Sequence, residues 1–253
     1  MRLTLIQTNL HWEDPAANRK MFSGKFDHLI GKTDLVVIPE MFTTGFSMRS
    51  KELAETMEGP TISWLKQSAN KIGAVITGSM IIKEGENFFN RLLWVNPNGA
   101  INHYDKKHLF TLAGEQKHYQ AGKKRIIIEY KGWKICPLIC YDLRFPVWSR
   151  NNVDYDLLIY VASWPDRRRE AWRTLLKARA IENQCYTIGV NRVGEDGSEL
   201  RYVGDSTLID FAGKPLLAAE KIEGVFTVEI SLTERQDFIN KLPFLADRDE
   251  FHL

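Results

Sequence analysis

The sequence has few cysteines, no long apolar run and little net charge. Three cysteines among 253 residues do not indicate the disulfide framework of a small secreted domain, so a reduced, cytoplasmic setting is expected. No apolar run approaches the roughly 18 residues of a membrane-spanning helix, and the N-terminal stretch turns polar without a signal-peptide core. A formal charge of +2 is too small to indicate a nucleic-acid partner. We therefore expect a soluble cytoplasmic protein with neither a membrane nor a nucleic acid as a partner.

The chain also lacks internal repeats, low-complexity tracts and linkers rich in Gly and Ser. Hydrophobic residues make up 44% and charged residues 26%, the balance of an ordinary globular protein. A chain of this length buries well over half of its unfolded surface and needs no disulfide for stability. Because the composition does not change along the chain, we expect one domain over residues 1–253.

Short apolar segments alternate with amphipathic ones along both halves of the sequence. The amphipathic segments predict four helices, at Pro15–Ile30, Thr61–Lys71, Phe145–Asn152 and Arg168–Asn183. The apolar segments predict strands at Leu3–Gln7, Asp34–Ile38, Ala74–Ile82, Asn87–Val95, Ala100–Tyr104, Arg125–Tyr130, Trp133–Ile139, Asp156–Ala162, Gln184–Asn191, Ser206–Asp210, Pro215–Ala219 and Val225–Ile230. This alternation favours an α/β fold, a four-layer α-β-β-α sandwich in which helices flank two packed sheets.

Cys140 lies where an apolar strand is followed by a helical segment, in WKICPLICYDLRFPVWSR. A nucleophile at a sharp strand-to-helix turn is exposed, and the backbone N–H groups of the helix start face it. Those groups can lower the pKa of a thiol and bind an oxyanion. Free cysteine is also among the most buried residue types, so a small core side chain is the alternative. Cys136 and Cys185 lie inside apolar strands, where the core role is expected.

Two more polar residues follow predicted strands. Glu40 ends TDLVVIPE and precedes the apolar pair Met41 and Phe42. A desolvated carboxylate there can act as a general base near neutral pH, whereas a solvated charge at a strand end is the alternative. Lys106 lies in NHYDKKHLF, where lysine is ordinarily a surface residue, as we expect for Lys107.

Together these segments match a known pattern. Glu40 in VVIPEMF, Lys106 in YDKKHLF and Cys140 in ICYDLRFP resemble the three signature segments of the nitrilase superfamily of carbon–nitrogen hydrolases, in the same order and with typical spacing. The resemblance covers nearly the whole chain, including LLKARAIENQCYTIGVNRVG and GDSTLIDFAGKPL. The family's lysine lies two residues before the histidine of KxHLF, which selects Lys106. Glu115 matches a second family glutamate that orients the lysine and the substrate.

The resemblance implies a thiol amidase that uses no metal or other cofactor. Glu40 would take the thiol proton, and Cys140 would attack the amide carbon. Lys106 and the backbone N–H of Tyr141 would stabilise the oxyanion. Amides are poor electrophiles, and a covalent thioester divides one difficult hydrolysis into two easier steps.

Within the superfamily, ASWPDRRREAWRTLLKARAIENQ and FLADRDEF are similar to bacterial omega-amidases. That resemblance implies hydrolysis of the terminal amide of short 2-oxo dicarboxylic acid monoamides such as 2-oxoglutaramate and 2-oxosuccinamate. Phe46, Arg144 and Trp164 are the candidate substrate-binding residues. Arg144 could reach an anionic substrate, or it could pair with Asp142 or another buried acid to hold the turn, and the second role is preferred. The arginines at 167–169 are expected to be solvated or paired with neighbouring acids rather than to bind a substrate carboxylate.

Other functions stay open at this point. A different activity of the superfamily, on another amide, a carbamoyl compound or a nitrile, is the nearest alternative. In a metal-dependent phosphodiesterase, Glu40 would be a metal ligand beside Asn9, Asp205 and His252, and Cys140 would have no role. A non-catalytic interaction module is the third alternative. His103, His108 and His118 lack metal-ligand spacing, and His108 is expected to hold the lysine loop.

The resemblance also implies a symmetric homodimer. Proteins of this kind commonly pair through the helix after the nucleophile and the helix after the next strand, here Phe145–Asn152 and Arg168–Asn183. The tail, residues 242–253, is expected to lie at that contact. The candidate anchors are Trp148, Trp172, Leu175 and Leu176. The alternative is that these side chains form the core-facing side of amphipathic helices.

Overall fold

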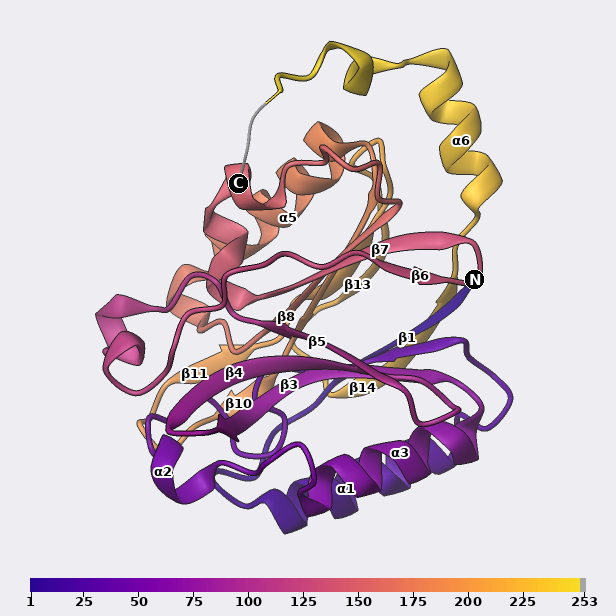
Figure 1. Cartoon of the computed structure of the whole chain (residues 1–253). Helices are drawn as coiled ribbons and strands as arrows, with labels where there is room; N and C mark the ends of the chain where they lie inside the picture. Colours follow the sequence, from indigo (N-terminus) through magenta and orange to yellow (C-terminus); the bar gives the residue numbers. More distant parts are fainter. Residues whose placement is uncertain (251–253) are drawn as a thin grey trace.

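The structure is a computed structural model that describes residues 1–250, and its framework is two six-stranded β-sheets (Figure 1). The first sheet has the strand order β14–β1–β2–β3–β4–β5, in which β1, β2 and β3 run parallel. Its strands are β1 (Arg2–Gln7), β2 (Leu35–Val37), β3 (Val75–Glu84), β4 (Asn87–Val95), β5 (Ile101–Asp105) and β14 (Gly224–Glu229).

The second sheet has the order β13–β12–β9–β8–β7–β6, and its central strands β7, β8 and β9 are parallel. Its strands are β6 (Ile128–Tyr130), β7 (Trp133–Ile139), β8 (Leu157–Ala162), β9 (Tyr186–Asn191), β12 (Ser206–Ile209) and β13 (Pro215–Ala219). A separate two-stranded ribbon is formed by β10 (Val193–Glu195) and β11 (Arg201–Val203).

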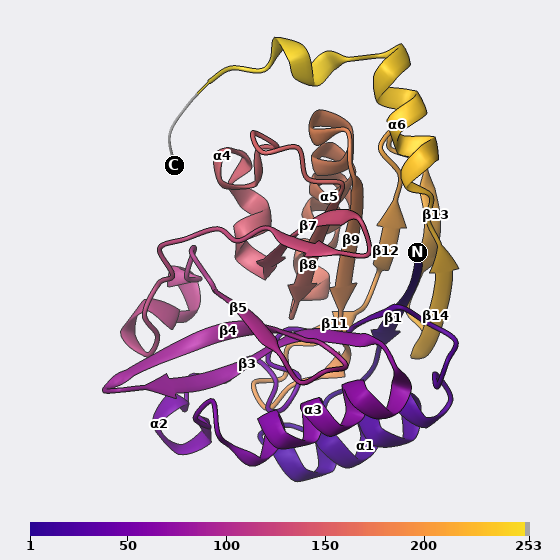
Figure 2. The same ribbon diagram turned by 45° about the vertical axis from the view of Figure 1, so that its right-hand side comes forward.

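Helices cover the outer faces of both sheets, as Figures 1 and 2 show. On the first sheet lie α1 (Pro15–Asp27) and α3 (Pro60–Ile72), and on the second lie α4 (Pro146–Ser149) and α5 (Arg169–Asn183). This order of layers confirms the predicted four-layer α-β-β-α sandwich. The other α-helices are α2 (Ser50–Leu53) and α6 (Leu232–Lys241). Within residues 1–250, none of the helices has the length and apolarity needed to cross a bilayer.

The continuous apolar run of β2 reflects burial on both of its faces. Leu35 and Val37 point into the cluster between the sheets, whereas Val36 and Ile38 pack against the helical layer of α1 and α3. All four side chains are fully buried. Successive strand residues face opposite ways, and a parallel strand covered on both sides therefore needs apolar residues at every position.

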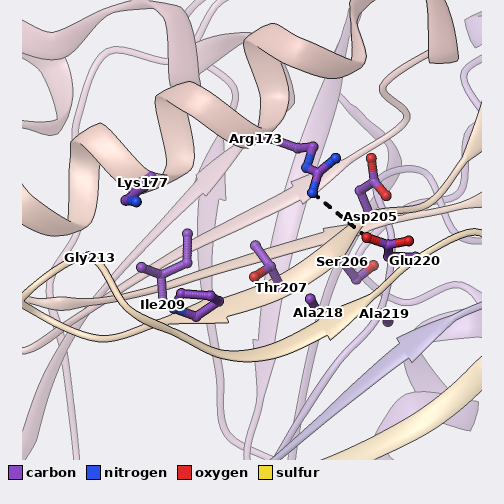
Figure 3. A pocket seen from close by; sticks show the side chains of 11 residues that line it. Arg173, Lys177, Asp205, Ser206, Thr207, Ile209, Gly213, Ala218, Ala219 and Glu220 are labelled. Atoms are coloured by element: carbon purple, nitrogen blue, oxygen red, sulfur yellow. Dashed lines mark ion pairs between the residues drawn. The ribbon is translucent and has the colours of Figure 1, made fainter.

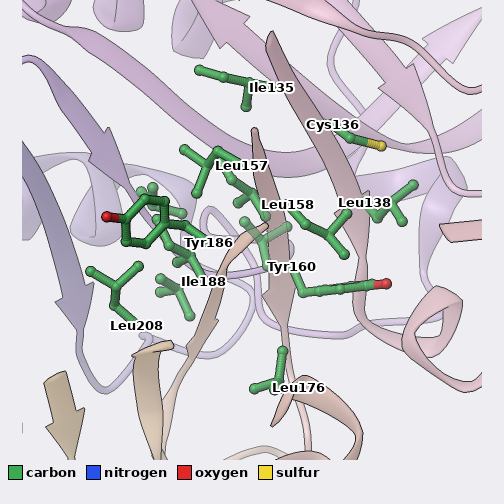
Figure 4. Close-up of a cluster of buried hydrophobic side chains, with 14 of the residues drawn as sticks. Ile135, Cys136, Leu138, Leu157, Leu158, Tyr160, Leu176, Tyr186, Ile188 and Leu208 are labelled. Atoms are coloured by element: carbon green, nitrogen blue, oxygen red, sulfur yellow. The ribbon is translucent and has the colours of Figure 1, made fainter. Parts of the chain in front are cut away.

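The same rule shapes the second sheet, whose core Figure 4 shows around Leu158, Tyr160 and Leu176. Here α5 approaches β9 at Gly189. A Cβ atom on Gly189 would lie 2.4 Å from Leu176 and 2.6 Å from Trp172. Only glycine therefore lets this helix lie so close to the strand.

Two predicted helices differ from the structure by more than one residue at an end. The helix expected at Pro15–Ile30 ends at Asp27 in α1. The helix expected at Phe145–Asn152 is instead a 3-10 helix, Cys140–Arg144, followed by the single turn α4. The correction matters, because the helical turn begins at the cysteine itself and not five residues after it.

Helices α2 and α6 and the β10–β11 ribbon were not predicted. The start of α6 carries a signal that could have been recognised, because Ser231 is its N-cap and accepts a hydrogen bond from the N–H of Glu234. Its place is set by the fold, where Arg235 pairs with Asp156 at the start of β8. The ribbon strands are three residues each, too short for periodicity to predict.

The interior takes up several side chains for which other roles were weighed. Cys136 and Cys185 are fully buried, which confirms their core role. Trp172 and Leu176 are 1% and 0% exposed and belong to the core, so the prediction that they anchor a partner is wrong. Trp148, 7% exposed, is likewise enclosed, since its indole N–H donates to the Tyr104 hydroxyl. Helical spacing alone did not reveal which way these residues face.

Candidate active site

Glu40, Lys106 and Cys140 lie just beyond the ends of three strands. Glu40 follows β2 and Lys106 follows β5 in the first sheet, whereas Cys140 follows β7 in the second. Because the two sheets pack face to face, segments 34 and 66 residues apart in the chain meet at one end of the sandwich. The fold thus brings the three predicted residues into one buried site.

Lys106 is enclosed by two carboxylates. Its Nζ lies 2.9 Å from Glu40 Oε1 and 2.9 Å from Glu115 Oε2, and all three side chains are 0% exposed. Burial by itself would lower the pKa of the ammonium, but the charges of Glu115 and Glu40 outweigh it and raise that pKa. Lys106 is therefore held as a cation, and Glu115 has the orienting position expected for it.

Glu40 is fixed through both carboxylate oxygens. Oε1 accepts from Asn90 Nδ2 at 2.8 Å as well as from Lys106, and Oε2 accepts from the backbone N–H of Ser163 at 2.8 Å. The next residue, Met41, has a φ of 44°. A non-glycine residue in this left-handed region is strained, and the strain accompanies a sharp turn directly after the glutamate.

Cys140 also has a left-handed backbone, with a φ of 43°. It begins the 3-10 helix, whose first N–H groups, including that of Tyr141, have no partner within the helix. Burial strongly raises the pKa of the thiol, Glu40 raises it further, and Lys106 lowers it. The pKa of this thiol is therefore raised on balance, although the start of a helix by itself can lower it. Because Cys140 rests as a neutral thiol, it needs a base to become a nucleophile.

Asp142 holds the cysteine turn against the lysine loop. Its Oδ1 accepts from the backbone N–H of His108 at 2.9 Å and lies 2.8 Å from His108 Nδ1. Its Oδ2 accepts from the Tyr104 hydroxyl at 2.7 Å and from the N–H of Ile139 at 3.1 Å. These contacts confirm that His108 supports the lysine loop. They leave Asp142 no role as a partner of Arg144, so that preferred pairing is wrong.

Arg144 lies instead at a pocket that opens onto Cys140. Its guanidinium stacks over the Trp164 ring at 5.0 Å, and the Phe46 ring lies 5.0 Å from Lys106 Nζ. All of these residues line the pocket, which has a volume of about 210 Å³. Drug-sized ligands occupy pockets of about 300–1,000 Å³, so this one suits a smaller molecule. The structure thus places Phe46, Arg144 and Trp164 together at the pocket onto which Cys140 opens.

Several lining residues were not predicted. Phe110, Leu200 and Tyr202 contribute side chains from loops and the short β11 strand, and Arg167 and Arg168 face the same space. The arginine run was expected to be solvated or to pair with neighbouring acids. Nothing in the local sequence shows that Arg167 and Arg168 face the pocket of the cysteine, because the path of the loop after β8 determines their direction.

Arg169 is the exception in that run. It forms an ion pair with Asp205, with Nη2 to Oδ1 at 2.9 Å, so its partner comes from the segment before β12 and not from a sequence neighbour. Figure 3 shows a second cavity nearby, of about 240 Å³, between α5 and the strands β12 and β13. Arg173 and Glu220 pair across it at 3.8 Å. No cysteine lines this cavity.

The residues required by the phosphodiesterase alternative are engaged elsewhere. Glu40 binds Lys106, Asp205 pairs with Arg169, and Asn9 accepts from Arg192 Nη2 at 3.0 Å. His252 lies outside the described residues. The structure therefore gives that alternative no assembled site within residues 1–250.

Known proteins resemble this chain along its whole length. A sequence model of the carbon-nitrogen hydrolase family matches residues 3–240. Omega-amidase YafV of Yersinia enterocolitica is 45% identical over 100% of this chain and 98% of its own. The 2-oxoglutaramate amidase of Bacillus subtilis is 32% identical over 97% of this chain and 96% of its own.

A solved structure also resembles this chain along its whole length. XC1258 from Xanthomonas campestris is a CN-hydrolase superfamily protein whose crystal structure has an arsenic adduct in the active site. It matches this chain with a TM-score of 0.98 and 46% identity, over 100% of this chain and 98% of XC1258. With a family match over nearly all of its residues and relatives of this identity, the chain belongs to the carbon-nitrogen hydrolase family of the nitrilase superfamily.

Proposed function

We propose that this carbon-nitrogen hydrolase is an omega-amidase that converts short 2-oxo dicarboxylic acid monoamides to the 2-oxo acid and ammonia. The observation that carries the chemistry is the buried group of Glu40, Lys106 and Glu115 beside a thiol that opens onto a pocket. The substrate class rests on the relatives named omega-amidase and 2-oxoglutaramate amidase. On this basis 2-oxoglutaramate and 2-oxosuccinamate are the proposed substrates.

Acylation begins with the neutral thiol. Glu40 accepts the proton from Cys140, and the thiolate attacks the amide carbon to form a carbon–sulfur bond. The Lys106 ammonium and the Tyr141 backbone N–H stabilise the oxyanion that develops. Removing one such donor typically lowers the rate about 10²–10³-fold. The protonated Glu40 then gives its proton to the nitrogen, the carbon–nitrogen bond breaks, and ammonia departs.

Deacylation uses the same carboxylate in reverse. Glu40 takes a proton from a water molecule, and the oxygen of that water attacks the thioester carbon. The carbon–sulfur bond breaks, the sulfur recovers the proton, and the carboxylic acid leaves. The two fixed oxygens of Glu40 suit a base that acts twice, because Ser163 and Asn90 hold it in one place throughout. No step requires a metal or another cofactor.

The pocket residues position the rest of the substrate. Phe46 and Trp164 supply apolar walls for the acyl chain, and Arg144 supplies a cation for its carboxylate. Glu115 does not touch the substrate's reacting atoms in this scheme. It neutralises and orients Lys106 through two contacts, at 3.0 and 2.9 Å.

An ammonia-release assay across 2-oxoglutaramate, 2-oxosuccinamate, glutamine, asparagine and a simple nitrile tests the proposal. We expect the 2-oxo acid amides to give the highest kcat/KM, and Cys140→Ala to remove nearly all turnover. Cys136→Ala is the matched control, because that thiol lies in the core and not in the pocket. Preference for the nitrile, or full turnover in Cys140→Ala, would contradict the proposal.

We propose further that residues 1–253 form one domain of a cytoplasmic homodimer. The family match over residues 3–240 supports the single domain. For the dimer, Val147 in α4 and Ile181 in α5 are 61% and 48% exposed on the two segments expected to pair. In the tail expected at the contact, Phe244 is 60% exposed. Residues 251–253 of that tail lie outside the described residues.

A further inference from the structure

Three guanidinium groups face the pocket without a carboxylate partner. Arg144, Arg167 and Arg168 line it, and within residues 1–250 none of the three forms an ion pair. Their neighbour Arg169 does pair, with Asp205, outside the pocket. Arginines that have no internal counter-ion at a binding pocket are available to an anionic ligand.

Aromatic rings hold two of these groups in place. The guanidinium of Arg168 stacks over Phe110 at 4.8 Å, and that of Arg144 stacks over Trp164 at 5.0 Å. The Trp164 indole N–H also donates to the backbone carbonyl of Arg168 at 2.8 Å, which ties the two arginines together. Stacking orients a guanidinium through its face and leaves the N–H edge free to donate.

The pocket is one-sided in charge. Among residues 1–250 no carboxylate lines it, and Glu40 and Glu115 are both bound to Lys106. Burial lowers the pKa of Arg168, and the positive charges of Arg167 and Arg144 lower it further. The lowered pKa of Arg168 reflects several cations that lie close together. A positively charged group on a ligand would meet the same repulsion.

We propose that Arg168, acting with Arg144, makes the enzyme select 2-oxo acid amides over 2-amino acid amides. The inference rests on the proposed function and names the residues that set its specificity. A 2-oxo acid presents a carboxylate and a neutral carbonyl oxygen, and both accept hydrogen bonds from a planar guanidinium. Glutamine presents the same carboxylate beside an ammonium. In this pocket the ammonium would meet cations and no free carboxylate.

Four amides separate the effect of the substrate carboxylate from the effect of a 2-ammonium group. These are 2-oxoglutaramate, glutaramate with the same carboxylate and no 2-substituent, glutamine with the added ammonium, and neutral pentanamide. We would measure kcat/KM for each with the wild-type enzyme, Arg168→Gln, Arg168→Lys and the double variant Arg144→Gln/Arg168→Gln. Arg173→Gln is the matched control, because Arg173 lies on the adjoining helix α5 and outside the pocket.

We expect Arg168→Gln to lower the ratio of 2-oxoglutaramate to glutamine turnover about 10–100-fold, the effect of losing one charge-assisted contact. The ratio of glutaramate to pentanamide should fall by a similar factor, because one of the two arginine contacts to the carboxylate is lost as well. Arg168→Lys keeps the charge and should retain most of the discrimination against glutamine. The double variant should lose more, and Arg173→Gln should leave both ratios unchanged.

Two results would overturn the inference, and they are distinguishable. If the wild-type enzyme hydrolyses pentanamide better than 2-oxoglutaramate, the proposed substrate class fails and the inference fails with it. If the wild-type enzyme prefers 2-oxoglutaramate but both ratios survive in Arg168→Gln and in the double variant, only the role of the arginines is wrong. Circular dichroism of each variant shows that the fold is kept.

Discussion

At the residue scale, the site depends on a single ammonium placed between two carboxylates. Glu40 and Glu115 each lie 2.9 Å from Lys106 Nζ and are fully buried. Removing one member of a buried ionic group leaves uncompensated charge and is strongly destabilising. Lys106 therefore has a structural task in addition to the proposed catalytic one.

We predict that Lys106→Ala loses more than about 10²-fold in kcat, since it removes one oxyanion donor. Lys107→Ala is the control, because Lys107 packs 5.2 Å from the Trp148 ring and does not line the pocket. It should keep most of the activity. Steady-state kinetics of the two variants decides the assignment, and comparable losses in both would contradict it.

Lys106→Arg should also fail. The side chain is 0% exposed and closed in by two carboxylates. A planar guanidinium is larger than the ammonium and cannot take the same position at a close oxyanion contact. Recovery of wild-type kcat in this variant would show that a positive charge alone is sufficient at this position.

The raised pKa of Cys140 leads to a prediction for the Glu40→Gln variant. Its thiolate should form more easily, and yet its turnover should fall. Burial and then the Glu40 charge raise this pKa. In Glu40→Gln the charge is gone, so the thiolate should form at lower pH, although turnover should fall about 10²–10⁴-fold for want of a general base. Ultraviolet absorbance of the thiolate against pH, corrected with Cys140→Ala, follows the titration. Burial raises the pKa of Cys136 and Cys185 to about 12, well away from neutral pH.

A thiolate titration that moves to higher pH in Glu40→Gln would contradict this account. It would mean that Lys106, released from Glu40, no longer favours the thiolate. Unchanged turnover would contradict the role of Glu40 as the base.

At the element scale, one carboxylate connects segments of the site that follow different strands. Asp142 lies in the 3-10 helix that begins at Cys140, and its hydrogen bonds reach Tyr104 at the end of β5 and His108 in the lysine loop. It therefore ties the nucleophile segment of the second sheet to the lysine segment of the first. The strained backbone at Cys140 is held from both sides of the sandwich.

Two glycines predict opposite effects on stability. Gly189 lies beneath α5, where a Cβ would approach Leu176 to 2.4 Å, and Gly189→Ala should destabilise the protein by about 1–3 kcal/mol through overpacking. Gly24 lies in α1 with no atom within 4 Å of its would-be Cβ, and Gly24→Ala should stabilise by about 0.5–1 kcal/mol. Urea unfolding of the two variants measures both. Equal signs would show that the packing of α5 on β9 is misread.

At the scale of the whole molecule, the open question is the partner surface. With Trp172 and Leu176 buried within the chain, Val147 and Ile181 are the exposed apolar side chains on the expected segments. We predict a homodimer at micromolar concentration by light scattering, because two-fold dimers are the commonest oligomers. The double variant Val147→Asp/Ile181→Asp should raise the dimer dissociation constant.

A control for that experiment is Leu216→Asp, which changes an apolar side chain that is 39% exposed on β13. It should leave the dimer intact, because β13 lies outside the expected segments. A wild-type protein that is monomeric and fully active would remove the dimer from this account. The proposed chemistry would stand, since the three reacting side chains come from one chain.

The sequence alone determined the strands of the two large sheets and the three candidate reacting residues. Double-sided burial makes strands such as β2 and β8 apolar at every position, and that pattern is local. Glu40, Lys106 and Cys140 could be predicted because each follows a strand within a recognisable motif. These properties depend on residues near one another in the chain, which is why they could be read without the fold.

The tertiary structure alone decided the electrostatics and the pocket. The helix start at Cys140 suggested a lowered thiol pKa, but burial and Glu40, 100 residues away in the chain, raise it. Arg144 lost its expected partner because Asp142 is occupied by Tyr104 and His108. Burial, charge and the facing of a side chain depend on which distant segments pack together, and spacing along one chain does not contain that information.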